Sequence, residues 1–146
     1  MSTRQCILTA TALICLALLS GCGTKTEGPA VYSKPVGAAD EGAAIQALRT
    51  ISSAQTQAKA MRNSYASFDS LVQLGFLDTR FAGETPNLRG YRFSMTANES
   101  QFAVNADPQV TENSTTTGSR HFYFESSDNI IHVNPTQPAT RQDPPL

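Results

Sequence analysis

Residues 41–65, EGAAIQALRTISSAQTQAKAMRNSY, decide the fold because they contain no proline and carry a sustained helical pattern of apolar residues. The apolar side chains recur at steps of three or four residues, which places them on one face of an α-helix. They are Ile45, Leu48, Ile51, Ala54, Ala58, Met61 and Tyr65. Asp40 precedes the stretch and can cap its first N–H groups. We therefore predict one long helix that starts after Asp40 and packs this apolar stripe on a sheet.

The period of the apolar residues changes to two after Gly90, which indicates β-strands. Residues 91–106 alternate apolar and polar side chains around a turn at residues 98–100, and they form the first predicted hairpin. Residues 120–134, with a turn at residues 126–129, form the second. Each hairpin is expected to have one apolar face and one solvated face.

A short helical region is predicted between the long helix and the first hairpin. Ser67 is a candidate N-cap, and Gly75 stands where a helix of this length would end. Asp78 can cap a further brief turn, and residues 83–89 are predicted to be a loop. The elements together predict an α+β fold, with a long N-terminal helix packed on a small antiparallel sheet of two hairpins.

The predicted domain spans residues 40–134, and the segments on both sides of it show no apolar period. Residues 22–39 begin with Cys22 and continue with a run rich in Gly, Pro, Thr and Ala, which we interpret as a flexible tether. Residues 135–146, PTQPATRQDPPL, contain four prolines and are predicted to be a disordered tail.

Residues 1–21 have the pattern of a secretory signal peptide. Arg4 supplies a positive charge before Ile7–Leu19, a run that is apolar apart from two threonines. At ~1.5 Å per residue this run spans only about 20 Å, whereas a helix needs ~20 apolar residues to cross a bilayer. The run is followed by Ser20-Gly21-Cys22, and Leu19 through Cys22 resembles the lipobox that the bacterial lipoprotein signal peptidase recognises.

The lipobox resemblance implies a processing site and a lipid anchor. Leu19, Ser20 and Gly21 would be the residues that the signal peptidase recognises. Cys22 would carry a diacylglyceryl thioether and, after cleavage, an acyl chain such as palmitate on its amine. Each buried CH₂ of an acyl chain contributes ~0.8 kcal/mol, so three chains would hold the protein on a membrane. Gly23, where retained lipoproteins of enteric bacteria have Asp, favours the outer membrane over the inner one. The implied location is the cell envelope, facing the periplasm.

Charge and cysteine content exclude several other classes. The chain has 11 Lys+Arg against 12 Asp+Glu, which leaves no basic field for nucleic acid. Its three cysteines are Cys6, Cys15 and Cys22, and all lie at or before the predicted cleavage point. The mature chain is therefore expected to have no disulfide, no thiol nucleophile and no cysteine metal site.

The order of the predicted elements resembles the globular half of type IV pilins and type II secretion pseudopilins, in which a leading helix packs on an antiparallel sheet. The matching stretches are residues 44–51 with the Ala54-Gln55 pair, Tyr65-Ala66, Leu71 through Gly75, and residues 90–93, 105–108 and 118–123. A prepilin has a Gly-Phe-Thr-Leu-x-Glu type processing site and a long apolar helix half, and here the lipobox stands in their place. The resemblance therefore implies a pilin-like head on a lipid anchor rather than a filament subunit.

His121 and His132 are the only histidines. If Glu125 pairs with Ile130 across the second hairpin, Tyr123 lies opposite His132. We expect Glu125 on the opposite face of the sheet, which makes the two histidines a poor metal site. They are interpreted as exposed or hydrogen-bonded sheet residues.

We find no catalytic constellation, and no enzyme, metal or cofactor is predicted. The mature chain has no Gly-x-Ser-x-Gly elbow, no Ser-x-x-Lys motif and no Gly-rich phosphate loop. Asp69 and Asp78 are explained by helix starts, and Asp128 lacks the further oxygen ligands of a calcium site. Six aromatic residues are interpreted as core, with a ligand-stacking platform as the alternative: Tyr91, Phe93, Phe102, Phe122, Tyr123 and Phe124.

These observations predict a membrane-anchored envelope lipoprotein with a non-catalytic pilin-like domain that acts through contacts with another envelope protein. The alternative is a small periplasmic ligand-binding lipoprotein that uses the aromatic sheet face. A hydrolase would need two titratable groups meeting in a cleft, which the sequence does not supply.

Overall fold

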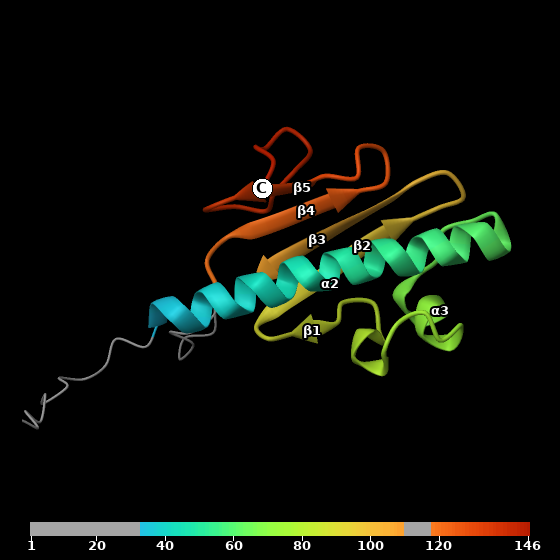
Figure 1. Cartoon of the computed structure of the whole chain (residues 1–146), viewed down its shortest axis with the longest axis horizontal. Helices are drawn as coiled ribbons and strands as arrows, with labels where there is room; N and C mark the ends of the chain where they lie inside the picture. The colour runs from blue at the N-terminus through green and yellow to red at the C-terminus, as the bar shows by residue number, and fades with distance from the viewer. Residues whose placement is uncertain (1–32, 110–117) are drawn as a thin grey trace, which may run out of the picture. The chain divides into compact units, whose positions relative to one another are not determined.

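The structure, a computed structural model, describes residues 33–109 and 118–146. Within them the chain forms one long α-helix, one short α-helix, one 3₁₀-helix and five strands (Figure 1). In chain order these are α2 (Ser33–Arg62), α3 (Phe68–Gln73), η1 (Thr79–Phe81), β1 (Asn87–Leu88), β2 (Tyr91–Ala97), β3 (Phe102–Pro108), β4 (His121–Glu125) and β5 (Ile131–Asn134). The predicted α+β class is confirmed.

The five strands form a single antiparallel sheet in the order β1-β2-β3-β4-β5, so each strand pairs with its neighbours in sequence. Both predicted hairpins are present, with pairs such as Phe93↔Ala106 and Tyr123↔His132. The prediction was incomplete in two respects. Strands β3 and β4 pair with each other and join the hairpins, and β1 occupies part of the predicted loop.

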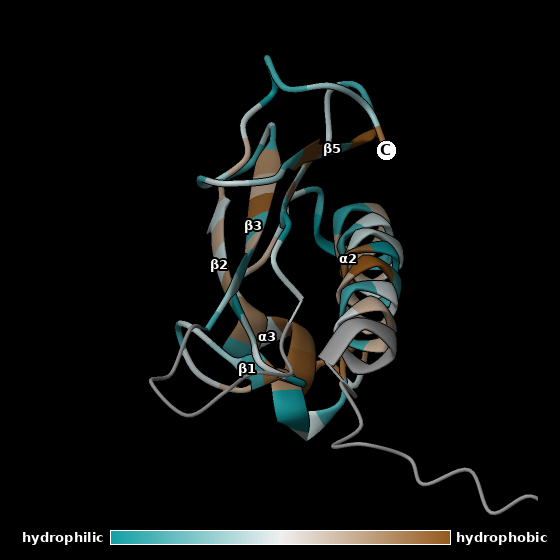
Figure 2. Cartoon of the chain, turned by 90° about the vertical axis from the view of Figure 1, so that its left-hand side faces the viewer, coloured by the Kyte–Doolittle hydropathy of each residue, from teal (hydrophilic) through white to brown (hydrophobic). Residues whose placement is uncertain are grey.

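Helix α2 covers one face of the sheet, and the core lies between the two layers (Figures 1 and 2). Most of the predicted stripe is buried, including Leu48, Ile51 and Ala58, each at 0% exposure. The prediction fails at Met61, which is 66% exposed near the end of the helix. Tyr65 lies beyond the helix but still joins the core edge, with its ring centroid 4.9 Å from that of Phe102.

Both ends of α2 differ from the prediction. The helix begins at Ser33 and runs through Pro35, so part of the predicted tether is helical. A proline is tolerated in the first helical turn because the N–H groups there have no intrahelical partner. Asp40 is consequently not an N-cap. Its carboxylate accepts a hydrogen bond from Nε of Arg89 at 3.1 Å. The helix ends at Arg62 because Asn63 adopts the left-handed conformation, with φ of 54°.

The predicted caps of the short helices are confirmed. The Ser67 hydroxyl accepts a hydrogen bond from the N–H of Ser70 at 3.3 Å, which starts α3. Gly75 follows the end of α3 with φ of 74°, a conformation that a side chain would disfavour. The Asp78 carboxylate accepts from the N–H of Arg80 at 2.9 Å and starts η1.

The prediction of a disordered C-terminal tail was wrong. Residues 135–146, here named the C-terminal strap, fold along the outer edge of β5 (Figure 1). The N–H of Val133 donates to the carbonyl of Pro144 at 3.0 Å, and the N–H of Leu146 donates to the carbonyl of Ile131 at 2.8 Å. Proline lacks an N–H but keeps its carbonyl, so a proline-rich segment can still satisfy the free N–H groups of an edge strand.

Candidate functional site

The predicted processing and lipidation residues, Leu19, Ser20, Gly21 and Cys22, lie outside the described residues, which begin at Ser33. The part of the predicted tether before Ser33 lies outside them as well. Among the helices that the structure describes, none combines the length and the apolar character needed to cross a membrane.

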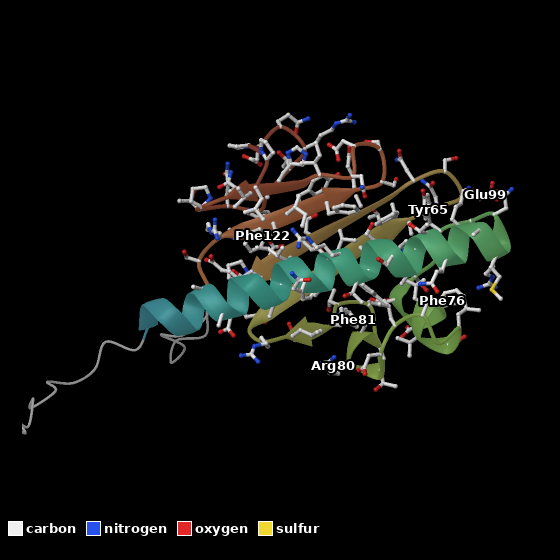
Figure 3. All side chains as sticks on the ribbon, viewed as in Figure 1. Tyr65, Phe76, Arg80, Phe81, Glu99 and Phe122 are labelled. Carbon is white, nitrogen blue, oxygen red and sulfur yellow. The ribbon has the colours of Figure 1, made fainter. Side chains whose placement is uncertain are left out.

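The aromatic residues of the sheet belong to the core. Tyr91, Phe93 and Phe122 are 0% exposed, and Phe102 and Phe124 are 4% exposed. Phe122 of β4 and Phe81 of η1 both contribute to the layer under α2 (Figure 3). The core interpretation is therefore confirmed for five of the six predicted residues. Those five side chains are buried and do not form an exposed platform on which a ligand could stack.

The sixth aromatic residue, Tyr123, lies on the opposite face of the sheet, together with the polar residues of β4 and β5. The pairing Tyr123↔His132 is as predicted, but the face assigned to Glu125 was wrong. The hydroxyl of Tyr123 donates to Oε2 of Glu125 at 2.8 Å, so the two side chains share a face. The correction follows from strand geometry, since residues two positions apart on a strand point to the same side.

His132 is the most enclosed polar side chain of this face, with 7% of the residue exposed. Its Nδ1 lies 2.7 Å from the backbone carbonyl oxygen of Asp143, in the C-terminal strap. Its Nε2 lies 3.0 Å from Oδ2 of Asp128, in the β4–β5 turn. Both ring nitrogens are therefore occupied by oxygen acceptors. When both ring nitrogens donate to these oxygens, the imidazole has no lone pair left to accept a proton from a substrate.

Glu125 connects β4 to the strap. Its carboxylate accepts hydrogen bonds from Tyr123 and Ser127 and forms an ion pair with Arg141 at 3.0 Å. The hydrogen bonds from Ser127 and Tyr123 lower the pKa of Glu125. Burial, together with the bond to Glu125, raises the pKa of Tyr123 to about 12. Tyr123 is therefore a neutral hydrogen-bond donor at neutral pH, and this group is organised as a structural connection.

His121, the second predicted histidine, is separate from His132. Its Nδ1 lies 2.6 Å from Oδ1 of Asp107 on the neighbouring strand β3. In the described ranges, no cluster of three or more His, Cys, Asp or Glu side chains could hold a metal ion. Asp128 accepts from the N–H of Ile130 at 3.1 Å as well as from His132, so its oxygens serve the turn and the imidazole.

A second polar cluster, which the sequence analysis missed, fastens α2 to the start of β4. Oε1 of Glu41 accepts from the N–H groups of Ser119 and Arg120 at 3.0 and 3.2 Å, and Oε2 accepts from Nε of Arg120 at 2.8 Å. Burial raises the pKa of Glu41, but the hydrogen bonds from Arg120 and Ser119 outweigh it, and the pKa is lowered. The partners are 78 and 79 residues apart, so no local sequence signal marks the pair.

Several grooves open on the described surface. One of about 370 Å³ lies beside β5 and includes Phe124, Ile130 and Leu146 among its lining residues. A second of about 460 Å³ lies between α2 and the η1–β1 region, and a third of about 520 Å³ lies between α3 and β2. Every buried side-chain nitrogen and oxygen in the described residues has a hydrogen-bond partner. No unpartnered buried group therefore points into these grooves to mark a ligand.

No protein-family model matches the sequence, and a search of curated proteins found no match. The function of the chain is therefore inferred from its residues and geometry.

Proposed function

We propose that this chain is a cell-envelope lipoprotein, anchored through Cys22 and facing the periplasm, with a non-catalytic pilin-like body that binds another envelope protein. The observation that carries the proposal is the sequence Leu19-Ser20-Gly21-Cys22 directly after an apolar run that starts at Ile7. A short apolar run followed by small residues is typical of a secretory signal peptide, and the cysteine directly after them makes the stretch resemble a lipobox.

The cysteine distribution supports the anchor. Cys6 and Cys15 lie in the segment that cleavage would remove, and Cys22 is the last cysteine of the chain. Acylation would use the one thiol left in the mature protein. Residues 23–32 would separate the acylated cysteine from Ser33, where the described helix begins. Three acyl chains supply ample apolar surface for stable attachment.

The architecture of the body supports a pilin-like, non-catalytic role. Within the described residues, a single long helix lies across one face of an antiparallel sheet whose strands follow one another in sequence. This arrangement resembles that of a pilin head. The polar residues of the other face, including His132 and Glu125, are engaged in hydrogen bonds between β4, the β4–β5 turn and the strap. These contacts stabilise the fold, and the remaining exposed surface is available to a protein partner.

The anchor is tested by growing cells that express the tagged chain with an alkyne analogue of palmitate. We expect the wild-type chain and a Cys15→Ala variant to be labelled and to fractionate with membranes. Cys22→Ala should lose the label, because the acceptor thiol is absent. Equal labelling of Cys22→Ala and wild type, or an uncleaved precursor in the cytosol, contradicts the anchor.

The membrane assignment is tested by density-gradient separation of inner and outer membranes. We expect the wild-type chain in the outer-membrane fraction, because Gly23 follows the acylated cysteine, and we expect Gly23→Asp to move to the inner-membrane fraction. An inner-membrane location for the wild-type chain would overturn this part of the proposal and leave the anchor intact.

The role in binding is tested by cross-linking on intact membranes, followed by affinity capture and mass spectrometry. We expect an envelope protein to be captured with the wild-type chain at a higher yield than with secreted Cys22→Ala, since anchoring raises the local concentration of the partners. Capture of the chain alone contradicts a binding role.

A further inference from the structure

The two acceptors around His132 decide its protonation state. The carbonyl oxygen of Asp143 faces Nδ1, and the carboxylate of Asp128 faces Nε2. The pKa of Asp128 is lowered, so that carboxylate is ionised near neutral pH and can only accept. A neutral imidazole carries a single N–H, and it would direct a lone pair at one of the two oxygens. Only the imidazolium form donates to both.

We propose that the protonation of His132 controls the attachment of the C-terminal strap. The protonated side chain holds the end of the strap on the edge of β5, and the deprotonated side chain releases that end.

The released end is residues 144–146, which cover the outer edge of β5. Asp143 itself stays attached, because its carboxylate also accepts a hydrogen bond from Nδ2 of Asn134 at 2.8 Å. Pro145 forms a bridge with His132 itself, between the hydrogen bonds that Val133 donates to Pro144 and Leu146 donates to Ile131. The N–H of Leu146 and the N–H of Val133 therefore report on the attachment of the strap. Their loss would leave the backbone groups of an edge strand without partners.

The first part of the strap is held by contacts that do not depend on His132. Nδ2 of Asn105 donates to the carbonyl of Ala139 at 2.9 Å, and Ala139 is 1% exposed. The Asn134 side chain accepts from the N–H groups of Thr136 and Gln137 at 3.0 and 3.1 Å. These bonds involve no group that titrates near neutral pH, so residues 135–139 stay attached when His132 is deprotonated.

The charged groups around His132 come from three elements: Asp128 from the turn, Glu125 from β4, and Arg141 and Asp143 from the strap, with Tyr123 of β4 beside the ring. The carbonyl of Asp143 and the carboxylate of Asp128 raise the pKa of His132 above 6.5, against an opposing effect of burial. The pKa values of Asp143 and Glu125 are lowered, so these carboxylates stay charged.

The sign of the pH dependence follows from the raised pKa of His132. The folded form binds the proton more tightly than the unfolded form, so the stabilisation is complete below pH 6.5 and is lost as the pH rises through the pKa of the folded protein. The end of the strap is therefore attached below pH 6.5 and is released as the pH rises through the raised pKa of His132.

The test uses the full-length ¹⁵N-labelled chain in detergent, with amide exchange measured by NMR from pH 5.5 to 9 and corrected for its intrinsic pH dependence. We expect the protection of Val133 and Leu146 to fall by about tenfold as His132 deprotonates, because a charged hydrogen bond contributes at least a factor of this size. The N–H of Phe93, which donates to Pro86 at the other edge of the sheet, should keep its protection throughout.

Three variants distinguish the effect of His132 protonation on the strap from general effects on the stability of the fold. His132→Gln should show low protection of Val133 and Leu146 at every pH, whereas His121→Gln, which removes the other imidazole of this face, should keep the wild-type pH dependence. Asp128→Asn keeps the imidazole but removes its carboxylate partner, so the loss of protection should move to lower pH. Unchanged protection at Phe93 shows that each variant is folded. The proposal fails if His132 titrates while the protection of the strap stays constant, or if His132→Gln matches wild type at pH 6.

Discussion

Gln55 is a fully buried polar side chain on the core face of α2, at 0% exposure. Its amide forms two bonds with the backbone of Ala66: Nε2 donates to the carbonyl oxygen at 2.7 Å, and Oε1 accepts from the N–H at 2.9 Å. Nε2 also lies 3.1 Å from the sulfur of Met95. The side chain thereby ties the loop after α2 to the helix and satisfies backbone groups that are removed from water.

Gln55→Ala should reduce the free energy of unfolding by about 2–4 kcal/mol, because it leaves the N–H and the carbonyl of Ala66 buried without partners. Chemical denaturation measures the change. The matched control is Gln57→Ala, at an exposed position two residues further along α2, which should change stability by less than about 0.5 kcal/mol. Equal effects of the two substitutions would contradict a stabilising role for the hydrogen bonds between Gln55 and Ala66.

Gly118 is required by close packing. A Cβ atom at this position would overlap Cγ of Glu41 and lie 2.5 Å from the hydroxyl oxygen of Tyr91. Both neighbours are themselves fixed, since Glu41 binds Arg120 and the Tyr91 hydroxyl donates to the carbonyl of Arg120 at 2.9 Å.

Gly118→Ala should destabilise the fold by about 1–3 kcal/mol, as expected for overpacking at a site that cannot expand. Gly42→Ala is the control, because a Cβ at Gly42 meets nothing within 4 Å. That substitution should stabilise the protein by about 0.5–1 kcal/mol, since alanine is a better helix former than glycine. Thermal denaturation of the two variants should give midpoint shifts of opposite sign, and shifts of the same sign would contradict the packing argument.

At the scale of elements, α2 and β4 are joined by Glu41, whose side chain is 13% exposed, and by Arg120. The lowered pKa of Glu41 means that the unfolded chain binds this proton more readily than the folded one. The contribution of Glu41 is therefore complete above its ordinary pKa of 4.5 and is lost as the pH falls from there through the lower pKa of the folded state.

Glu41→Gln should reduce stability at pH 7 by about 1–2 kcal/mol, the range of a charge-assisted hydrogen bond, with a smaller difference from wild type at pH 3. Urea denaturation at a series of pH values checks the result. Glu84→Gln, at an exposed position, is expected to follow the wild-type pH profile. A difference between Glu41→Gln and wild type that is constant from pH 7 to pH 3 would contradict the assigned role.

At the scale of the whole molecule, a half-solvated antiparallel sheet accounts for the distribution of residue types. The face beneath α2 holds the aromatic core, and the other face holds the polar residues of β4 and β5 that bind the strap. Such a sheet has two free edges, and the strap covers one of them at β5.

The amino-acid sequence by itself determined the α+β class, the two hairpins and the caps at Ser67 and Asp78, because apolar period and capping act over a few residues. Only the tertiary structure decided the pairing of β3 with β4, the helical start at Ser33 and the folded strap. It also decided the roles of Gln55, Glu41 and His132. Each of these depends on a partner brought close by the chain as a whole, and local periodicity carries no information about such a partner.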